Sequence, residues 1–331
     1  MTLLIEEKIE PSPPERSRRR APKDARAPKP PKPPKPPRRV PRPRKASRPL
    51  TPMQATLRMV SALLAILLLG MTLYLMVFSR LTHVIAQDRL NDQLREQLSE
   101  GTAPVSEGTF EDVLLQDGAP VAQLRIPQIG VDETVAEGTT SGVLMSGPGH
   151  RRDTMLPGQF GTSVVMGRAA AFGGPFGRLQ ELQPGDKISV VTGQGEHVYE
   201  VIGVRYAGDP APAPITFGEG RLVLVTARGP AFLPSGALRV DAELVSDVQA
   251  PGTRATTHAG LPKAAQELQG DASHLWALVF ALQALVLVEI GAVWTYRNIG
   301  ARQTWIVFLP VGLLASLAAA DQLTRLLPNL L

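Results

Sequence analysis

Residues 59–78 read MVSALLAILLLGMTLYLMVF and contain no charged side chain. As a helix, a run of this length would cross the roughly 30 Å hydrocarbon core of a bilayer. The basic segment before it is too long for a signal peptide, and no cleavage site with small residues follows it. We therefore predict an uncleaved membrane anchor, with a transmembrane helix over residues 57–79.

The segment before this anchor is strongly basic and rich in proline. Residues 1–58 hold 17 Lys and Arg against 5 Asp and Glu, and residues 1–50 hold 14 prolines, including the stretch KPPKPPKPP at 29–37. Such a composition cannot bury an apolar core, so we predict a disordered tail over residues 1–56. Its charge predicts a cytoplasmic N-terminus by the positive-inside rule. The tail is a solvated tether, a segment that binds anionic membrane lipid, or a ligand for a Pro-recognising partner; without interleaved aromatic residues, we expect no nucleic-acid binding.

Two further apolar runs predict transmembrane helices over residues 273–296 and 303–322. Trp276 and Trp294 lie about 27 Å apart along the first of these, a spacing that suits the aromatic belts of a membrane helix. The connector RNIGAR carries two arginines and no acid, so we expect it in the cytoplasm and the C-terminus outside. A buried helical hairpin is the alternative, but no soluble part of the chain is large enough to cover it.

One acidic residue, Glu289, falls inside the second predicted span. A carboxyl group within a membrane is a functional hypothesis by default, and it would face another helix or a membrane-protein partner. The alternative is that Glu289 lies near enough to the cytoplasmic end to reach water or Arg297.

Between the anchor and the C-terminal pair, short β-like runs alternate with Gly/Pro turns, a pattern that favours an all-β barrel or sandwich. We assign residues 80–117 to an extracytoplasmic stalk, 118–248 to the β domain and 249–272 to a linker. The β-like runs are AQLRI, VDETVA, SVVMG, ISVVT, HVYEVIGVRY, RLVLVT and LRVDAELV.

The composition excludes several kinds of chemistry. The chain has no cysteine, so it has no disulfide, no thiolate nucleophile and no cysteine-based metal site. Its five histidines are scattered, with no pair three or four residues apart. We therefore expect no metal and no cofactor.

The β domain nevertheless resembles a known family. The stretches LRIPQIGVDETVAEGTT (124–140), SGPGHRRDTMLPGQFGTSVVMGR (146–168) and FGGPFGRLQELQPGDKISV (172–190), followed by RLVLVTA and LRVDAELV, are similar in order and spacing to sortases. These are the cell-wall transpeptidases of Gram-positive bacteria, and the likeness is strongest to the actinobacterial class E type. The resemblance implies an eight-stranded closed β-barrel with a groove for a sorting-signal peptide of the Leu-Pro/Ala-any-Thr-Gly kind.

The resemblance also implies three catalytic positions: a cysteine that attacks the Thr–Gly carbonyl, a histidine that protonates the leaving amine, and an arginine that stabilises the oxyanion. The cysteine pattern falls on LVLVTA, which gives Ala227, and the histidine pattern falls on GRAAAFGGPF, which gives Arg168. The arginine of the last strand matches Arg239. Two of the three positions are therefore replaced, and a methyl group cannot form a thioester.

These replacements leave several interpretations open. The main one is a catalytically inactive membrane protein that binds a sorting signal, a sortase or another envelope protein, with helices 273–296 and 303–322 available to membrane partners. The rivals are an atypical active transpeptidase or hydrolase and a scaffold whose groove is vestigial. Thr226 is a poor substitute nucleophile because its side chain should point into the barrel, and we expect His150 to be a structural hydrogen-bonding residue.

A second hypothesis concerns positive charge at the same place. If the barrel forms as the family implies, Arg168, Arg228 and Arg239 converge on the old catalytic position and could clamp a carboxylate or phosphate. The alternative is that Arg228 turns into its loop and Arg239 pairs with an acid such as Asp241.

Overall fold

The computed structural model describes residues 51–109, 111 and 113–331, so the predicted tail lies outside the described residues except at its end. The described chain begins with a long helical stretch formed by α1 (Pro52–Leu73), a π-helical turn (Tyr74–Phe78) and α2 (Ser79–Glu100). Thr51 starts it with a capping box, in which its hydroxyl accepts from the Gln54 backbone N–H and the Gln54 side chain accepts from the Thr51 N–H. Gly101 ends it in the left-handed conformation, with φ of 71°.

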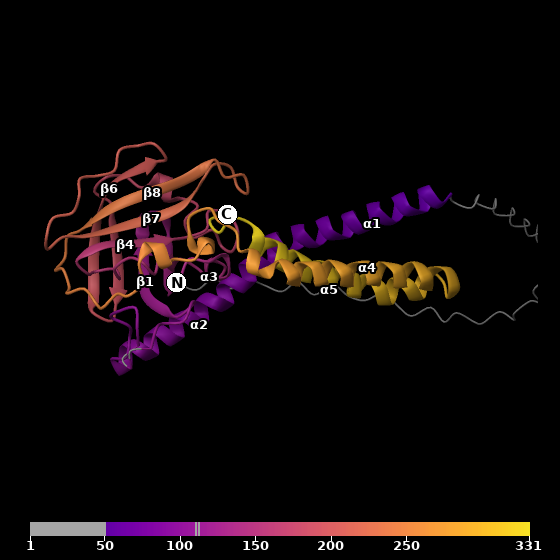
Figure 1. The fold of residues 1–331 in the computed structure, drawn as a ribbon, viewed down its shortest axis with the longest axis horizontal. Helices are drawn as coiled ribbons and strands as arrows, with labels where there is room; N and C mark the ends of the chain where they lie inside the picture. Colours follow the sequence, from indigo (N-terminus) through magenta and orange to yellow (C-terminus); the bar gives the residue numbers. More distant parts are fainter. Residues whose placement is uncertain (1–50, 110, 112) are drawn as a thin grey trace, which may run out of the picture. The chain divides into compact units, whose positions relative to one another are not determined.

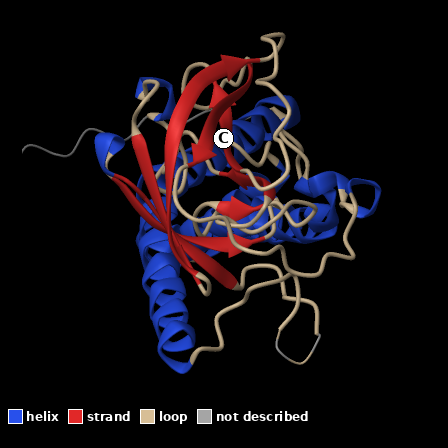
Figure 2. Ribbon diagram, turned by 90° about the vertical axis from the view of Figure 1, so that its left-hand side faces the viewer, coloured by secondary structure: helices blue, strands red, loops and turns tan. Residues whose placement is uncertain are grey.

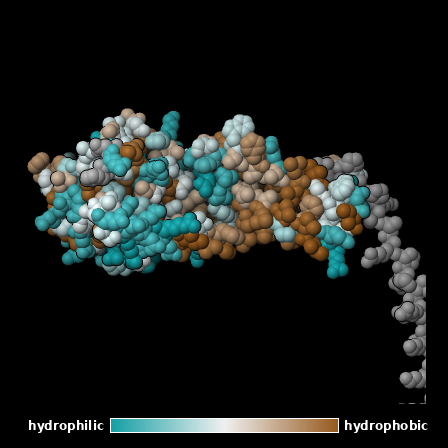
Figure 3. Space-filling view, turned by 90° about the horizontal axis from the view of Figure 1, so that it is seen from below, coloured by the Kyte–Doolittle hydropathy of each residue, from teal (hydrophilic) through white to brown (hydrophobic). Residues whose placement is uncertain are grey.

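Three helical stretches of the described chain are long and apolar enough to cross a membrane: Leu57–Glu100, Ala272–Asn298 and Ala301–Leu326. The last two contain α4 (Leu275–Asn298) and α5 (Ala301–Leu326), which pack side by side, and α1 packs against α5 (Figure 1). Apolar side chains gather on the outside of this helical part, whereas polar ones cover the barrel (Figure 3). The three predicted spans therefore coincide with helices of suitable length and apolar surface.

Residues 120–244 form a closed barrel in the order β1-β2-β3-β4-β7-β8-β6-β5 (Figure 2). The pairs β2–β3 and β4–β7 are parallel, and the other pairs are antiparallel. This confirms the predicted all-β closed barrel. The strands are β1 (Pro120–Ile126), β2 (Val131–Glu137), β3 (Gly149–His150), β4 (Gly161–Met166), β5 (Lys187–Thr192), β6 (Gly195–Tyr206), β7 (Gly220–Arg228) and β8 (Gly236–Leu244).

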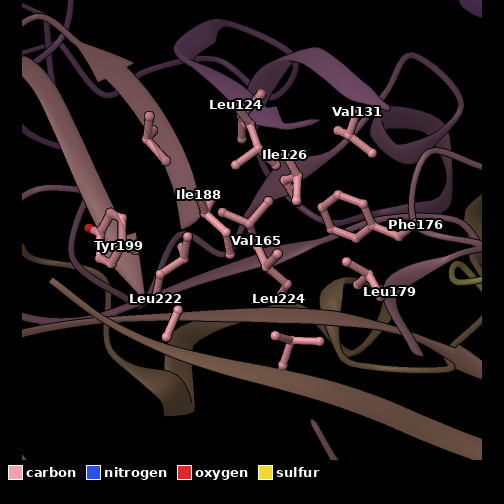
Figure 4. Packing of buried hydrophobic residues seen from close by; sticks show 14 of the residues in the cluster. Leu124, Ile126, Val131, Val165, Phe176, Leu179, Ile188, Tyr199, Leu222 and Leu224 are labelled. Atoms are coloured by element: carbon pink, nitrogen blue, oxygen red, sulfur yellow. The ribbon is translucent and has the colours of Figure 1, made fainter. Parts of the chain in front are cut away.

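Alternation along the strands builds two apolar layers. On β7, Leu222 and Leu224 point into the barrel and join its main core, which Figure 4 shows with side chains from several strands meeting there. Val223 and Val225 point the other way and belong to a separate buried cluster on the outer face. The continuous apolar run in β7 therefore reflects a strand that is covered on both faces.

Helix α2 lies against the barrel and is not a free stalk. Leu90 and Leu94, one helical turn apart, are buried. The side-chain amide of Gln87 binds both backbone groups of Thr134 on β2. Its oxygen accepts from the Thr134 N–H at 2.7 Å, and its nitrogen donates to the Thr134 carbonyl at 3.1 Å. Helix α2, which continues the helix of the predicted membrane span, is thus fixed to β2.

Candidate functional site

The ends of three neighbouring strands define the site. In the parallel pair β4–β7, Met166, the last residue of β4, lies beside Val225; Arg168 follows Met166 by two residues, as Ala227 follows Val225. On the other side of β7, Ala227 lies directly opposite Ala237 of β8. The Gly167 N–H donates to the Val225 carbonyl at 3.0 Å, so the backbones at Arg168 and Ala227 run next to each other.

The third predicted position lies one step away. Arg239 is opposite Val225, and the residue directly beside Ala227 is Ala237, which is 6% exposed. Because side chains on one face of a strand repeat every two residues, Arg239 and Ala237 share a face, but the nearest neighbour of the Ala227 methyl group on β8 is another methyl group. The match of Arg239 to the arginine of the family stays a prediction.

The outer face at this point is apolar and already covered. Val223, Val225 and Ala237 pack in one buried cluster with side chains from β4, from the short helix α3 (Ser141–Leu144) and from the C-terminal segment, and Ala227 packs against it. Thr226 faces the opposite side, is 2% exposed, and donates its hydroxyl to the Gly167 carbonyl at 2.9 Å. Position 226 therefore carries no free hydroxyl towards this face.

Arg168 is the largest fully buried side chain here, with 1% exposure. Its Nε donates to the Leu144 carbonyl at 3.2 Å, and its Nη2 donates to the Ser141 carbonyl and hydroxyl at 3.0 and 2.8 Å. Its Nη1 donates to the Leu331 carbonyl at 2.9 Å. All three guanidinium nitrogens are thus engaged by protein oxygens.

The electrostatics of Arg168 are those of a buried cation. Burial lowers its pKa from 12.5 to about 10, so it remains protonated near neutral pH. Its guanidinium carbon lies 4.9 Å from the ring centroid of Phe172, at cation–π distance. Its four hydrogen-bond acceptors, named above, are three carbonyls and a hydroxyl. Such a group anchors backbone carbonyls, and it cannot donate and regain a proton near pH 7.

The other two arginines of the predicted cluster have separate partners. Arg228 is exposed and stacks on Tyr206, with its guanidinium carbon 4.3 Å from the ring centroid. Arg239 pairs with Glu267 of the 249–272 segment, whereas Asp241 pairs with Arg205. A shared anion site therefore requires these side chains to leave their present partners, and it stays a prediction.

The C-terminal segment is part of the site, which the sequence did not predict. Leu330 is fully buried in the cluster of Val223 and Val225, and its carbonyl accepts from the Ala169 backbone N–H at 2.9 Å. Asn329 beside it is also fully buried. The available signal was an apolar LLPNLL stretch directly after the last span, because an apolar tail needs a surface to cover it.

His150 has the structural role expected of it. It is fully buried on β3, with Nδ1 2.8 Å from Glu137 Oε2 and Nε2 2.8 Å from the Met155 carbonyl. Burial alone would raise the pKa of Glu137, but His150 and Arg152 outweigh it and lower that pKa. The contact between His150 and Glu137 ties β2 to β3 inside the fold.

Elsewhere, Glu289 on α4 is 8% exposed, and its Oε2 finds no hydrogen-bond partner among residues 51–109, 111 and 113–331. Within the same described ranges, no three His, Asp or Glu side chains gather closely enough to hold a metal ion.

A cavity of about 490 Å³ is lined by Asp117, Arg152, Leu261 and neighbouring residues, and includes neither Arg168 nor Ala227.

Part of the chain is similar to a known protein family. Residues 124–233 match the sortase domain. Sortase D of Bacillus subtilis is 30% identical over 105 residues, which make up 31% of this chain and 52% of that protein. The chain therefore spans about half the length of this curated relative.

Solved sortase structures are similar to part of this chain. A sortase D transpeptidase of Clostridium perfringens is 23% identical, with 49% of this chain and 99% of that chain covered and a TM-score of 0.41. A mutant of sortase E from Streptomyces avermitilis is 29% identical, with 46% and 100% covered and a TM-score of 0.34.

Proposed function

Since this chain carries a sortase domain over residues 124–233, we propose that it is a membrane-anchored sortase-like protein that performs no transpeptidation. It acts by binding a sorting-signal peptide, a sortase or another envelope protein. The observation that carries the proposal is the pair of methyl groups, Ala227 and Ala237, that face each other where β7 and β8 end. Neither can attack a carbonyl or stabilise an oxyanion.

The chemistry of the neighbouring groups supports this inactivity. Transpeptidation through an acyl-enzyme needs a nucleophile and a group that protonates the leaving amine. Arg168 has a pKa of about 10 and gives all its nitrogens to protein oxygens, and the Thr226 hydroxyl is bound to Gly167. Binding alone accelerates hydrolysis by only ~10³–10⁴-fold over water in enzymes stripped of their catalytic triad.

We further propose that the N-terminus is cytoplasmic and that the barrel and the C-terminus lie outside the membrane. Leu331, which follows α5, is hydrogen-bonded to Arg168 of the barrel, so both must lie on the same side of a membrane. The basic segment 1–58 favours the cytoplasm for the opposite end of α1. Cysteine-scanning with a membrane-impermeant thiol reagent tests this, since the chain has no cysteine of its own.

The binding function is tested by titrating the purified full chain with a Leu-Pro/Ala-any-Thr-Gly peptide and examining the same samples for cleavage. Saturable binding without cleavage supports the proposal. Cleavage would support the atypical transpeptidase or hydrolase instead.

A vestigial groove is the second candidate, and the burial of Leu330 at this site favours it. That function predicts no affinity for sorting-signal peptides, but co-purification of a partner through residues 1–58 or 274–320. Deleting residues 1–50 tests the first of these routes, because α1 begins only at Pro52.

The arginine cluster gives a separate binding proposal. If Arg168, Arg228 and Arg239 clamp an anion, the full chain binds a peptide carboxylate or an anionic lipid headgroup, and Arg168→Ala abolishes that binding. Equal retention of Arg168→Ala and wild type on anionic vesicles would contradict it.

A further inference from the structure

A short turn after α5 fills the apolar face beside Ala227. The Leu331 N–H donates to the Pro328 carbonyl at 3.1 Å, which closes a turn over Pro328–Leu331. Asn329 and Leu330 are fully buried, and Leu331 is 5% exposed. The turn is therefore packed into the fold and does not lie on its surface.

The Asn329 side chain carries most of the polar recognition. Its Nδ2 lies 2.8 Å from the Thr139 carbonyl, 2.9 Å from the Gln266 carbonyl and 3.4 Å from the Ala264 carbonyl. Its backbone N–H donates to the Gln269 carbonyl at 2.9 Å. Asn329 therefore joins the barrel loop after β2 to the segment before α4.

The barrel in turn recognises two backbone carbonyls and one leucine. The Ala169 N–H and Arg168 Nη1 donate to the carbonyls of Leu330 and Leu331, each at 2.9 Å. The Leu330 side chain packs with Val223 and Val225. If this turn left, the face would present two hydrogen-bond donors beside an exposed apolar surface, which is the chemistry of a peptide-binding site.

A chain of contacts connects this turn to the membrane helices. Tyr74, in the π-helical turn after α1, donates its hydroxyl to Asp321 of α5 at 2.5 Å, and its ring lies edge-on to Phe172, 6.2 Å between centroids. Phe172 in turn lies under the Arg168 guanidinium. Contacts therefore run from α5 through Tyr74 and Phe172 to Arg168, which binds Leu331.

We propose that this face is a peptide-binding site whose resident ligand is the chain's own Pro328–Leu331. A partner segment with the same groups, a leucine flanked by an asparagine and two free carbonyls, binds there only when the resident turn has withdrawn. This proposal rests on the proposed binding function and states how peptide binding is regulated. A tethered ligand acts at an effective concentration on the order of millimolar, so a free peptide of equal intrinsic affinity competes poorly.

The first test measures release of the turn. In the full chain in detergent, L330C provides a single thiol, because the protein has no cysteine. We expect it to react with a maleimide at least about tenfold more slowly than the thiol of L233C, since Leu330 is 0% and Leu233 70% exposed. Adding Asn329→Ala, which removes the amide contacts, should accelerate L330C about tenfold and leave L233C unchanged. Equal reactivity of L330C and L233C would overturn the proposal.

The second test measures the vacated site. The probe is a fluorescent peptide with the sequence of residues 325–331, and the variant is Asn329→Ala combined with Leu330→Ala, which alters the ligand and leaves the barrel residues intact. We expect this variant to bind the peptide at least about tenfold more tightly than wild type. The matched control, Asn298→Ala with Leu233→Ala, replaces exposed residues and should bind as wild type does.

Equal peptide affinity of the release variant and wild type, including no binding by either, would refute the resident-ligand proposal. Neither readout depends on cleavage. Transpeptidation by the wild-type chain would therefore refute the proposed function without altering protection of the L330C thiol, and the two failures remain distinguishable.

Discussion

Replacing Arg168 with alanine should destabilise the fold strongly, although this position is expected to do no chemistry. The side chain is 1% exposed and donates four hydrogen bonds, to the oxygens of Ser141, Leu144 and Leu331. Hydrogen bonds from a charged donor contribute about 1.5–3 kcal/mol each, or roughly 6–12 kcal/mol before the cost of burying the charge. The substitution also removes the hydrogen-bond donor of three carbonyl oxygens on a covered face.

The desolvation cost offsets part of this gain. The fall of the Arg168 pKa from 12.5 to about 10 corresponds to about 3 kcal/mol against the charged form. We expect a net loss of about 3–5 kcal/mol, the range measured when one member of a buried charged network is removed. At about 2–4 °C per kcal/mol for a domain of this size, the melting temperature should fall by at least about 6 °C.

The assay is thermal unfolding of the full chain in detergent, followed by the circular dichroism of the β-barrel. Arg228→Ala is the matched control, because that guanidinium is exposed and stacks only on Tyr206, so it should change stability by no more than about 1 kcal/mol. If Arg168→Ala melted with wild type, the guanidinium would not be an anchor, and its availability to an external anion would become the better explanation.

Three further predictions concern other parts of the molecule. Glu137→Gln should destabilise the protein by about 2–5 kcal/mol at pH 7; because the folded-state pKa of Glu137 is lowered, its contribution is present above pH 4.5 and lost as pH falls further, so the mutant and wild-type acid-unfolding curves should converge. Gly70→Leu should separate α1 from α5, since a Cβ at Gly70 would collide with Ser316. Gly312→Ala is the control, because a Cβ at Gly312 has room. Reduced recovery of a fragment of residues 1–100 with a co-expressed fragment of residues 101–331 would measure the separation. A227C should form no thioester with a sorting-signal peptide by intact mass, because position 168 holds no histidine and position 237 holds no arginine; an acyl adduct would contradict this.

The barrel was predictable because its strands carry clear local signals. All seven β-like runs became strands, since each alternates or is continuously apolar and ends at Gly or Pro turns. The two-residue strand Gly149–His150 was missed because no periodicity exists over such a length. Position 227 followed from a contiguous motif at the end of β7.

The rest of the site depends on long-range packing. The choice of Ala237 over Arg239 as the neighbour of Ala227 follows from the β7–β8 register, which pattern matching along one strand does not fix. The burial of Leu330 against β7 joins residues more than a hundred positions apart. Contact between the 80–117 segment and the barrel was not predicted, because its buried residues, Leu90 and Leu94, form only a narrow stripe.

Our main proposal is that the sortase-like domain performs no transpeptidation, because alanines stand where β7 ends and β8 begins. The most direct measurement incubates the purified full chain with a labelled Leu-Pro/Ala-any-Thr-Gly peptide and a glycine-based amine, followed by mass spectrometry of peptide and protein. We expect intact peptide and no mass added to the protein, because Ala227 offers no nucleophile. Release of the glycine-containing fragment, or transfer of the remainder to the amine, would contradict it.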